Sequence, residues 1–551
     1  MINNKPLFIF CSIVLFMLSF TNAGIFLNDE WITCSQLNQL SNGHQLTYND
    51  GKYGYFANNT PSTYMNDRNN VLMYSLALPI VSLPMYILLG IFGDFCRICI
   101  MVMWLWCLAY ILRSTIDIFK TPVMTLVITI LGLEMIVAFG NSFLFFGDYI
   151  PSEVLAIVLT NIVILGLCGV VIYRISEVLF KTNIQYIVII SVLSFTSLLF
   201  WASTCKDHVL TSFIFLLFIY MIIIINSHKN IDEKYIDYFY VILGSLVGAM
   251  IFIRVEIGVA LCLYGVCFTL WYNRKYIIQY LKFAGIFSLP MFLNNYIVSG
   301  NVLVHPFYFA NRGGNTYLNA SSDYLHAVTS PVLPSINDII LFLFAPPTGC
   351  FSFVASISIL IIALCVINKR NIQNQHILPI IGAGIFSSLY YIFMSGMALS
   401  TDHGILPNMR YLIPLFIACI LVGFIIIDTI KIKYHFMNRL LFMLPIIISI
   451  MFIIIFITPF GNSYYNFTTF VNIVFITPIV LLILKIGIIN RIRPVKEEDT
   501  KMFILDLITL SIALVVAWQF TLLFLYNEVK INAYPMFIPL FEHIHNIFFL
   551  I

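Results

Sequence analysis

Residues 206–225 read KDHVLTSFIFLLFIYMIIII, and this stretch decides the fold. Three ionisable residues, Lys206, Asp207 and His208, stand directly before seventeen residues, 209–225, that carry no charge. An uncharged apolar run of about 17–25 residues has the length that crosses a bilayer as a helix. The stretch therefore predicts a transmembrane helix that begins with charged side chains at one membrane face.

The rest of the chain repeats this pattern. Of its 551 residues, 61% are hydrophobic and 10% are charged, whereas a soluble chain averages about 45–50% apolar and about 25% charged residues. A soluble domain is excluded, and a net charge of +3 without basic runs argues against nucleic acid as a partner. We expect an all-α polytopic membrane protein with about 13–15 transmembrane helices. The candidate spans lie near residues 7–23, 98–112, 121–140, 152–173, 184–203, 208–226, 236–253, 256–272, 277–296, 352–368, 377–396, 411–430, 440–459, 467–487 and 502–526.

Segment 71–93 decides the topology. It is apolar, but prolines and glycines interrupt it, so we expect it to lie along the surface or to re-enter rather than to cross. With the N-terminus in the cytoplasm, 20 of the 28 lysines and arginines then lie inside, which satisfies the positive-inside rule. We therefore predict a multi-pass cell-membrane protein. The first apolar stretch also has the form of a signal peptide, and we favour an uncleaved helix.

The cations on the outside gather in particular places. They are Lys52, Arg68, Arg97, Lys206, Arg254, Arg312, Arg410 and Lys530. Arg254 and Glu256 interrupt an otherwise apolar stretch, and Arg410 opens a later span. Charge at a membrane face is costly unless it is paired or binds something. Several such cations on one surface suit an anionic headgroup such as a lipid phosphate.

The first long outside loop, 24–97, begins with the adjacent carboxylates Asp29 and Glu30; the second long loop is 297–351. Two carboxylates near the bilayer can supply a general base and a positioning or ligand group. Each pattern also has a plainer interpretation: Asp29-Glu30 as a solvated helix end, and Lys206-Asp207 as a local ion pair. The histidines do not share metal-ligand spacing, and Gly244-x-x-x-Gly248 is typical of close helix packing.

In their order these elements resemble the GT-C superfamily of membrane glycosyltransferases, particularly its protein O-mannosyltransferase and aminoarabinose transferase branch. The elements that carry the resemblance are Asp29-Glu30, the Pro-containing segment from Leu78-Pro79 to Gly93, Arg97, Lys206-Asp207, Arg254-Val255-Glu256 and Arg410-Tyr411-Leu412-Ile413-Pro414. The chain lacks the Lys-Pro-Pro element of some branches and the Trp-Trp-Asp signature of oligosaccharyltransferases. The resemblance covers residues 1–430, as a transmembrane catalytic domain, and leaves 431–551 as additional C-terminal transmembrane helices.

The resemblance implies an inverting hexosyltransferase that takes its sugar from a polyprenyl-phosphate donor on the extracytoplasmic face. The acceptor would be a protein, a glycan or a lipid. By the same resemblance, Asp29 would be the general base, with Glu30 beside it as the second catalytic candidate. The implied donor-phosphate ligands are Lys206, Arg254, Arg97 and Arg410, and the implied substrate-binding residues are Asp207, Glu256 and His208. No cofactor is indicated with certainty, and a divalent metal ion stays open.

Two other classes of protein fit the composition. A transporter or flippase of a lipid-linked saccharide is the main alternative. A transporter favours inverted repeats with paired broken helices at mid-membrane, whereas here the polar residues gather at one face. An inactive relative that scaffolds other membrane proteins is the second, and substitution of Asp29 separates it from an active transferase.

Overall fold

The protein is described by a computed structural model. It describes residues 4–25, 30–44, 74–92, 96–118, 152–180, 184–227, 233–303, 305, 350–368, 374–393, 408–429, several residues between 439 and 450, 477–489, 496–529 and 531–535. The span predicted near 121–140, most of the one near 440–459 and the first half of the one near 467–487 lie outside the described residues.

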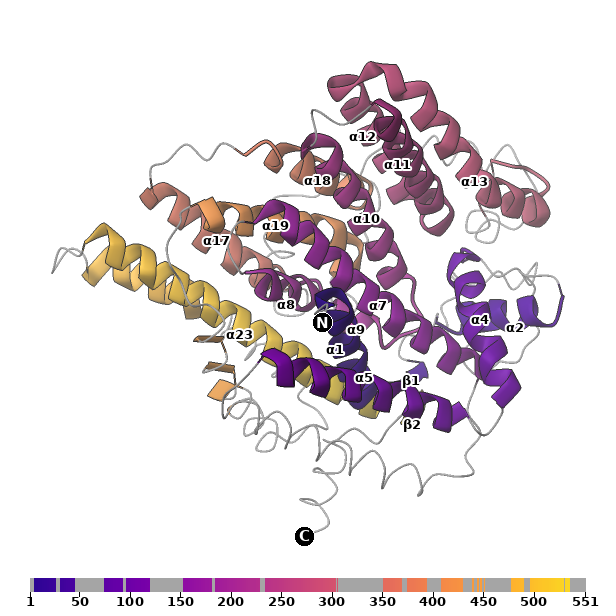
Figure 1. The fold of residues 1–551 in the computed structure, drawn as a ribbon, viewed down its shortest axis with the longest axis horizontal. Coiled ribbons are helices and arrows are strands. Elements are labelled where there is room, and N and C mark those ends of the chain that lie inside the picture. Colours follow the sequence, from indigo (N-terminus) through magenta and orange to yellow (C-terminus); the bar gives the residue numbers. More distant parts are fainter. Residues whose placement is uncertain are drawn as a thin grey trace, which may run out of the picture.

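Helices dominate the described part of the chain (Figure 1). The first group comprises α1 (Lys5–Phe20), α2 (Glu30–Ser41), α4 (Ala77–Phe92), α5 (Cys96–Ile118), α7 (Ser152–Leu179), α8 (Gln185–Phe195) and α9 (Leu198–Trp201). The second comprises α10 (His208–Ser227), α11 (Glu233–Ile253), α12 (Val255–Tyr272) and α13 (Ile277–Ser299). The third comprises α17 (Cys350–Asn368), α18 (Ile377–Phe393), α19 (Ile413–Thr429) and α23 (Glu497–Val529). Short 3₁₀ helices are η2 (Arg274–Tyr276) and η4 (Asn408–Leu412), and η5 (Lys485–Ile489) is a short π-helix.

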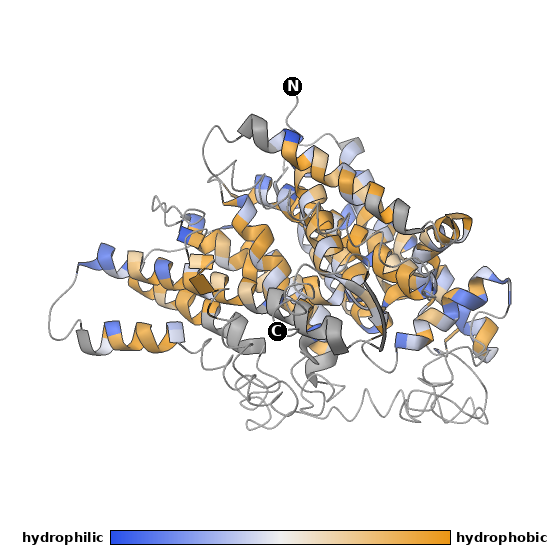
Figure 2. Cartoon of the chain, turned by 90° about the horizontal axis from the view of Figure 1, so that it is seen from below, coloured by the Kyte–Doolittle hydropathy of each residue, from blue (hydrophilic) through white to orange (hydrophobic). Residues whose placement is uncertain are grey.

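This architecture confirms the predicted all-α polytopic membrane fold. Within the described residues, seven helices are long and apolar enough to cross a membrane, and further apolar helices are shorter. The hydropathy colouring shows apolar residues along most helices and polar residues mainly at helix ends and on α2 (Figure 2). One predicted span differs: the segment expected to run continuously over 184–203 is divided into α8 and α9 at Ser197. Ser197 has the left-handed φ of 56°, and Gln519 of α23 donates a hydrogen bond of 3.1 Å to its hydroxyl.

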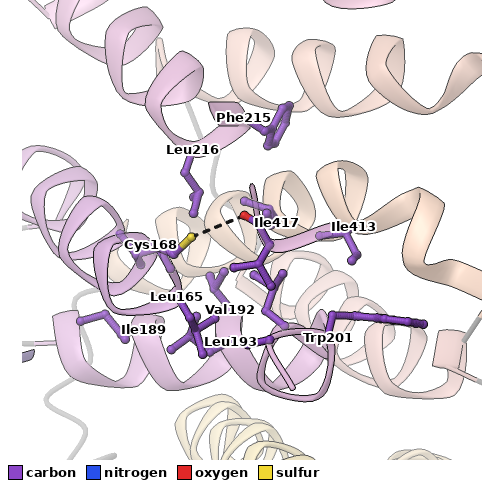
Figure 3. Packing of buried hydrophobic residues seen from close by; sticks show 14 of the residues in the cluster. Leu165, Cys168, Ile189, Val192, Leu193, Trp201, Phe215, Leu216, Ile413 and Ile417 are labelled. Carbon is purple, nitrogen blue, oxygen red and sulfur yellow. Dashed lines mark hydrogen bonds between the residues drawn. The ribbon is translucent and has the colours of Figure 1, made fainter. Parts of the chain in front are cut away.

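The centre of the bundle is formed by α7, α8, α10 and α19 (Figure 3). Leu165 and Cys168 of α7 pack among side chains of α8, Leu216 of α10 and Ile417 of α19, all buried. The thiol of Cys168 lies 4.0 Å from the carbonyl oxygen of Val209, at the start of α10. Because lipid is as apolar as these side chains, close packing rather than removal from water holds such helices together.

Helices α11, α12 and α13 form a separate group beside α10 and α18 (Figure 1). The prediction of close packing for the Gly-x-x-x-Gly pair is confirmed. A Cβ atom on Gly244 would meet the carbonyl oxygen of Tyr280 in α13, and one on Gly248 would meet the carbonyl oxygen of Ala284. Large apolar side chains such as Trp271 are exposed on the outer faces of α12 and α13, as expected of surfaces that face lipid.

Segment 24–97 contains structure that the sequence did not indicate. Its acidic start leads into α2, and the segment 71–93 contains α4, which continues helically through Pro84. One face of α4 is buried through Leu78 and Leu89, while Ile87 and Ile91 are exposed. Strand β1 (Asn22–Ile25), at the start of this segment, pairs antiparallel with β2 (Ile531–Pro535), which follows α23. The end of the described chain is thereby attached beside the start of segment 24–97.

Candidate functional site: a cluster of cations at the start of helix α10

The segment 202–207 between α9 and α10, here called the site loop, is held by side chains from two other helices. Asn161 of α7 donates hydrogen bonds from Nδ2 to the carbonyl oxygens of Thr204 (2.9 Å) and Lys206 (3.0 Å). The carboxylate of Glu30, at the start of α2, accepts a hydrogen bond of 2.8 Å from the backbone N–H of Cys205. The backbone around Lys206 is therefore fixed from both sides.

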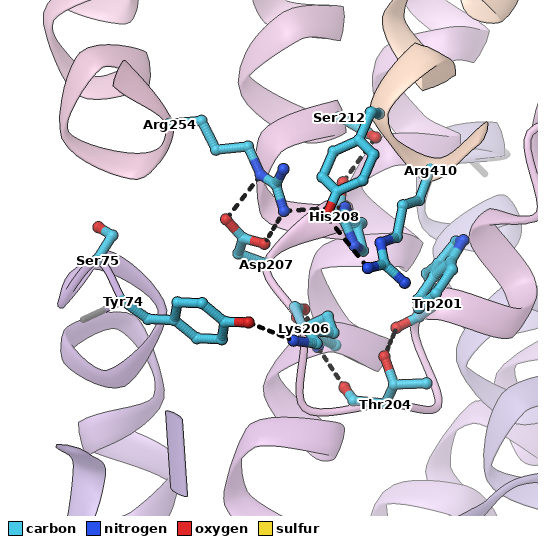
Figure 4. Close-up of polar contacts among 12 residues, drawn as sticks. Tyr74, Ser75, Trp201, Thr204, Lys206, Asp207, His208, Ser212, Arg254 and Arg410 are labelled. Atoms are coloured by element: carbon cyan, nitrogen blue, oxygen red, sulfur yellow. Dashed lines mark hydrogen bonds and ion pairs between the residues drawn. The ribbon is translucent and has the colours of Figure 1, made fainter. Parts of the chain in front are cut away.

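The Lys206 side chain is buried although it ends in a charge, with only 5% of the residue exposed. Its Nζ donates a hydrogen bond of 3.2 Å to the hydroxyl of Tyr74 and lies 4.6 Å from the centre of that ring (Figure 4). Tyr74 stands just before α4, so this contact joins the site loop to the segment that leads into α4.

Asp207 and Arg254 form a bidentate ion pair. The guanidinium donates from Nε to Oδ2 at 2.9 Å and from Nη2 to Oδ1 at 2.6 Å, and Nη2 also lies 3.2 Å from Nδ1 of His208 (Figure 4). The side chains are 22% and 13% exposed, respectively. Arg254 interrupts the helical backbone between α11 and α12 with φ −144° and ψ 103° and is the N-cap of α12. This break points the chain of α12 back along α11 and brings the guanidinium to α10.

A row of aromatic rings connects Arg254 with Arg410. The centre of the Arg410 guanidinium lies 5.4 Å from the ring of Trp201 and 4.9 Å from that of Tyr411. Arg254 lies 5.4 Å from the same Tyr411 ring. His208 meets Trp201 edge-on at 4.7 Å and Tyr411 at 6.1 Å between ring centres. Guanidinium groups bind favourably over aromatic faces, so the rings fix both arginines around His208.

All three cations precede the first turn of a helix. Lys206 stands before α10, Arg254 before α12, and Arg410 in the turn η4 directly before α19. The first turn of a helix carries free N–H groups and the positive end of its dipole. Cations and helix N-termini thus add up to a positive potential at one place, where Asp207 contributes a carboxylate.

The structure brings together five of the predicted site residues: Lys206, Asp207, His208, Arg254 and Arg410. Other predicted residues are placed differently or lie beyond the described part. Asp29 lies outside the described residues, and of Arg97 only the backbone, in the first turn of α5, is described. Glu256, in the first turn of α12, lies close to His305. Burial lowers the pKa of His305, and the charge of Glu256 partly opposes this shift.

Three contributors were missed from the sequence: Asn161, Tyr74 and Trp201. A fourth, Tyr411, was quoted in the motif that begins at Arg410 but was given no role. Asn161 had a detectable signal, because a carboxamide inside an apolar span requires hydrogen-bond partners. Tyr74 and Trp201 gave no signal in a chain with 16% aromatic residues. Glu30 was predicted as catalytic, and the structure places its carboxylate, wholly buried, on the site loop.

The described residues contain no set of side chains arranged to bind a metal ion. Among the described residues, no group of three or more His, Cys, Asp or Glu side chains is placed to hold a metal ion. The divalent metal ion that the sequence left open therefore gains no support there.

Comparison with known proteins gives a likeness of fold. No family model matches the sequence, and no curated protein matches it. The crystal structure of ArnT from Cupriavidus metallidurans bound to undecaprenyl phosphate aligns with a TM-score of 0.44 and 11% identity, covering 93% of this chain and 76% of that chain. The apo structure of the same ArnT gives 0.41 and 10%, covering 92% and 75%. ArnT is a GT-C glycosyltransferase; at this identity the likeness concerns helix arrangement and not substrates or catalytic residues.

Proposed function

We propose that the chain is a membrane glycosyltransferase that takes a sugar from a polyprenyl-phosphate donor on the extracytoplasmic face. The observation that carries this proposal is the convergence of Lys206, Arg254 and Arg410, each at the start of a different helix. Helix N-termini and cations both favour an anion at the same place. A lipid phosphate is an anion that reaches this place from within the bilayer. A polyprenyl-phosphate carrier whose hydrocarbon tail stays in the membrane would present its phosphate to the three cations.

The same three cations are suited to stabilise the phosphate that leaves in a sugar transfer. In the proposed step, Asp29 takes the proton of an acceptor hydroxyl, and the hydroxyl oxygen bonds to the anomeric carbon. The bond between that carbon and the phosphate oxygen breaks with inversion, and its electron pair leaves with the phosphate. Charge grows on the phosphate oxygens as the bond breaks, so prearranged cations stabilise this transition state more than the ground state.

Glu30 is assigned a positioning role in this proposal. Its carboxylate accepts the Cys205 N–H, which holds the backbone next to Lys206. Asp207 has a comparable role for Arg254, because the bidentate pair fixes the guanidinium plane. In the sequence, Asp29, the proposed base, directly precedes Glu30, and Lys206, a proposed phosphate ligand, directly follows Cys205. The hydrogen bond between Glu30 and Cys205 therefore joins the two segments that carry them.

Sugar transfer in proteoliposomes tests the proposal. Purified protein receives radiolabelled polyprenyl-phosphate hexoses and a membrane extract of its host. We expect label in a new product, its loss with Asp29→Asn, and a decrease of about 100-fold or more with Lys206→Met, typical for removal of one transition-state contact. The control is Arg174→Gln, because Arg174 is an exposed cation of α7 paired with Glu177; it should keep full activity.

Two results would contradict the proposal. Equal loss in the Arg174 and Lys206 variants would mean that charge removal acts through folding. Movement of lipid-linked sugar across the bilayer without transfer, unaffected by Asp29→Asn, would establish the flippase instead.

A further inference from the structure

Two cysteines that are far apart in the sequence lie next to each other where α2 contacts the site loop. Cys34 lies one turn after Glu30 on α2, and Cys205 lies in the site loop. Their side chains interact with each other, and both residues are free thiols that are wholly buried. The thiol of Cys205 also lies 4.0 Å from the carbonyl oxygen of Val154, at the start of α7.

The neighbouring contacts place the two cysteines beside each other. Residues four apart on a helix lie on the same face, so Glu30 and Cys34 both face the site loop. Glu30 holds the backbone N–H of Cys205 at 2.8 Å, and Cys34 meets its side chain. The hydrogen bond of Glu30 therefore holds the backbone of Cys205 against the helix face that carries Cys34.

We propose that Cys34 and Cys205 form a disulfide bond that fastens α2 to the site loop. Both residues lie at the membrane face predicted to be extracytoplasmic, where disulfides form and persist. The two thiols lose two protons and two electrons as the S–S bond forms. The electrons pass to the disulfide of a protein thiol–disulfide oxidoreductase, which becomes a dithiol. This inference goes beyond the proposed sugar transfer and does not depend on it.

The surroundings of the pair indicate when the bond forms. Burial, contact with Cys205 and the charges of Glu30 and Glu153 raise the pKa of the Cys34 thiol well above its ordinary value. Since the thiolate is the species that exchanges with disulfides, a folded, reduced pair would react very slowly. The bond is therefore made while the site loop docks onto α2, and once buried it is shielded from reductants.

A second cysteine pair supplies an internal control. The side chains of Cys11 of α1 and Cys107 of α5 also interact with each other. They lie in apolar helices rather than in a loop at a membrane face. An oxidant in the aqueous compartment has no access to them there, so we expect this pair to stay reduced. If contact between thiols were sufficient, both pairs would be oxidised. If access to an aqueous oxidant is also required, only the pair Cys34–Cys205 is oxidised.

Disulfide mapping tests the inference. The full chain is expressed in a host that inserts it with α2 facing an oxidising compartment, denatured in the presence of N-ethylmaleimide, digested and examined by mass spectrometry. We expect one linked pair of peptides, containing Cys34 and Cys205, while Cys11 and Cys107 carry maleimide. In Cys205→Ser, Cys34 should become labelled; in the control Cys168→Ser, the linked peptides should persist.

Two outcomes would overturn the inference. Complete labelling of Cys34 and Cys205 in the wild-type protein is the first, and this result needs no variant to fold. Linkage of Cys11 to Cys107 to the same extent is the second, because it would show non-specific oxidation. If the bond is present, a strong reductant should lower the unfolding temperature of the wild type and leave that of Cys34→Ser unchanged. Sugar transfer is not used as a readout, so failure here leaves the proposed function untouched.

Discussion

The ion pair between Asp207 and Arg254 should contribute measurably to stability. Its two hydrogen bonds, 2.6 and 2.9 Å long, join groups that are only 22% and 13% exposed. A hydrogen bond to a charged group is worth about 1.5–3 kcal/mol, and partial exposure reduces that value through solvent screening. We therefore expect a coupling free energy of about 2–3 kcal/mol. This value lies between the roughly 0–1 kcal/mol of a solvent-exposed ion pair and the roughly 3–5 kcal/mol of stability that is lost when a buried ion pair is broken.

A double-mutant cycle measures this coupling. The free energy of unfolding is determined by steric trapping in bicelles for the wild type, Asp207→Asn, Arg254→Gln and the double variant. The matched control is the cycle on Arg174 and Glu177, which form a 2.8 Å ion pair with side chains 50% and 37% exposed. For that pair we expect a coupling of about 0.5 kcal/mol or less. Equal coupling in both cycles would refute the argument that burial strengthens the pair at the site.

Three further predictions concern other parts of the fold. Asn161→Leu leaves two buried loop carbonyls without their donor, so we expect about 2–4 kcal/mol of destabilisation in a denaturant titration, together with a higher KM for the lipid donor. Gly248→Leu should cost about 1–3 kcal/mol or more by forcing α11 away from α13, whereas Gly285→Leu, whose added Cβ meets nothing within 4 Å, should be nearly neutral. Burial lowers the pKa of His376, whose ring contacts Asn226, below the ordinary 6.5. The unfolded chain then binds more protons, so unfolding titrations should show stability falling as pH drops below about 6.5, and less so in His376→Gln.

The membrane fold could be predicted from the sequence because bilayer thickness imposes one length on every span. The segment expected near 208–226 is helix α10, and those expected near 236–253 and 256–272 are α11 and α12. The break at Ser197 could not be predicted, because serine carries no backbone signal for a left-handed residue. That conformation is supported by Gln519, which is more than three hundred residues away in the sequence.

The candidate site was predictable only in its charged part. Charged residues in an apolar chain are conspicuous, and for this reason Lys206, Arg254 and Arg410 could be selected without a structure. Their partners are ordinary residues whose roles depend on packing. Asn161 acts through the direction of one carboxamide, and Tyr74 through the position of the segment before α4, which brings its hydroxyl to Lys206. The identity of a residue predicts neither how far its side chain lies from the site nor in which direction it points.

The placement of the cations argues for an anion more strongly than their number does. A helix start favours a carboxylate, and a cation there costs about 0.3–1 kcal/mol because it faces the positive end of the dipole. Arg254 is paired with Asp207, and Lys206 and Arg410 stand at two further helix starts. A bound phosphate would gain from each of them, because each added helix start and each cation lowers its free energy. Under the proposed function, the placement that the helix dipoles disfavour is therefore the one that suits a lipid phosphate.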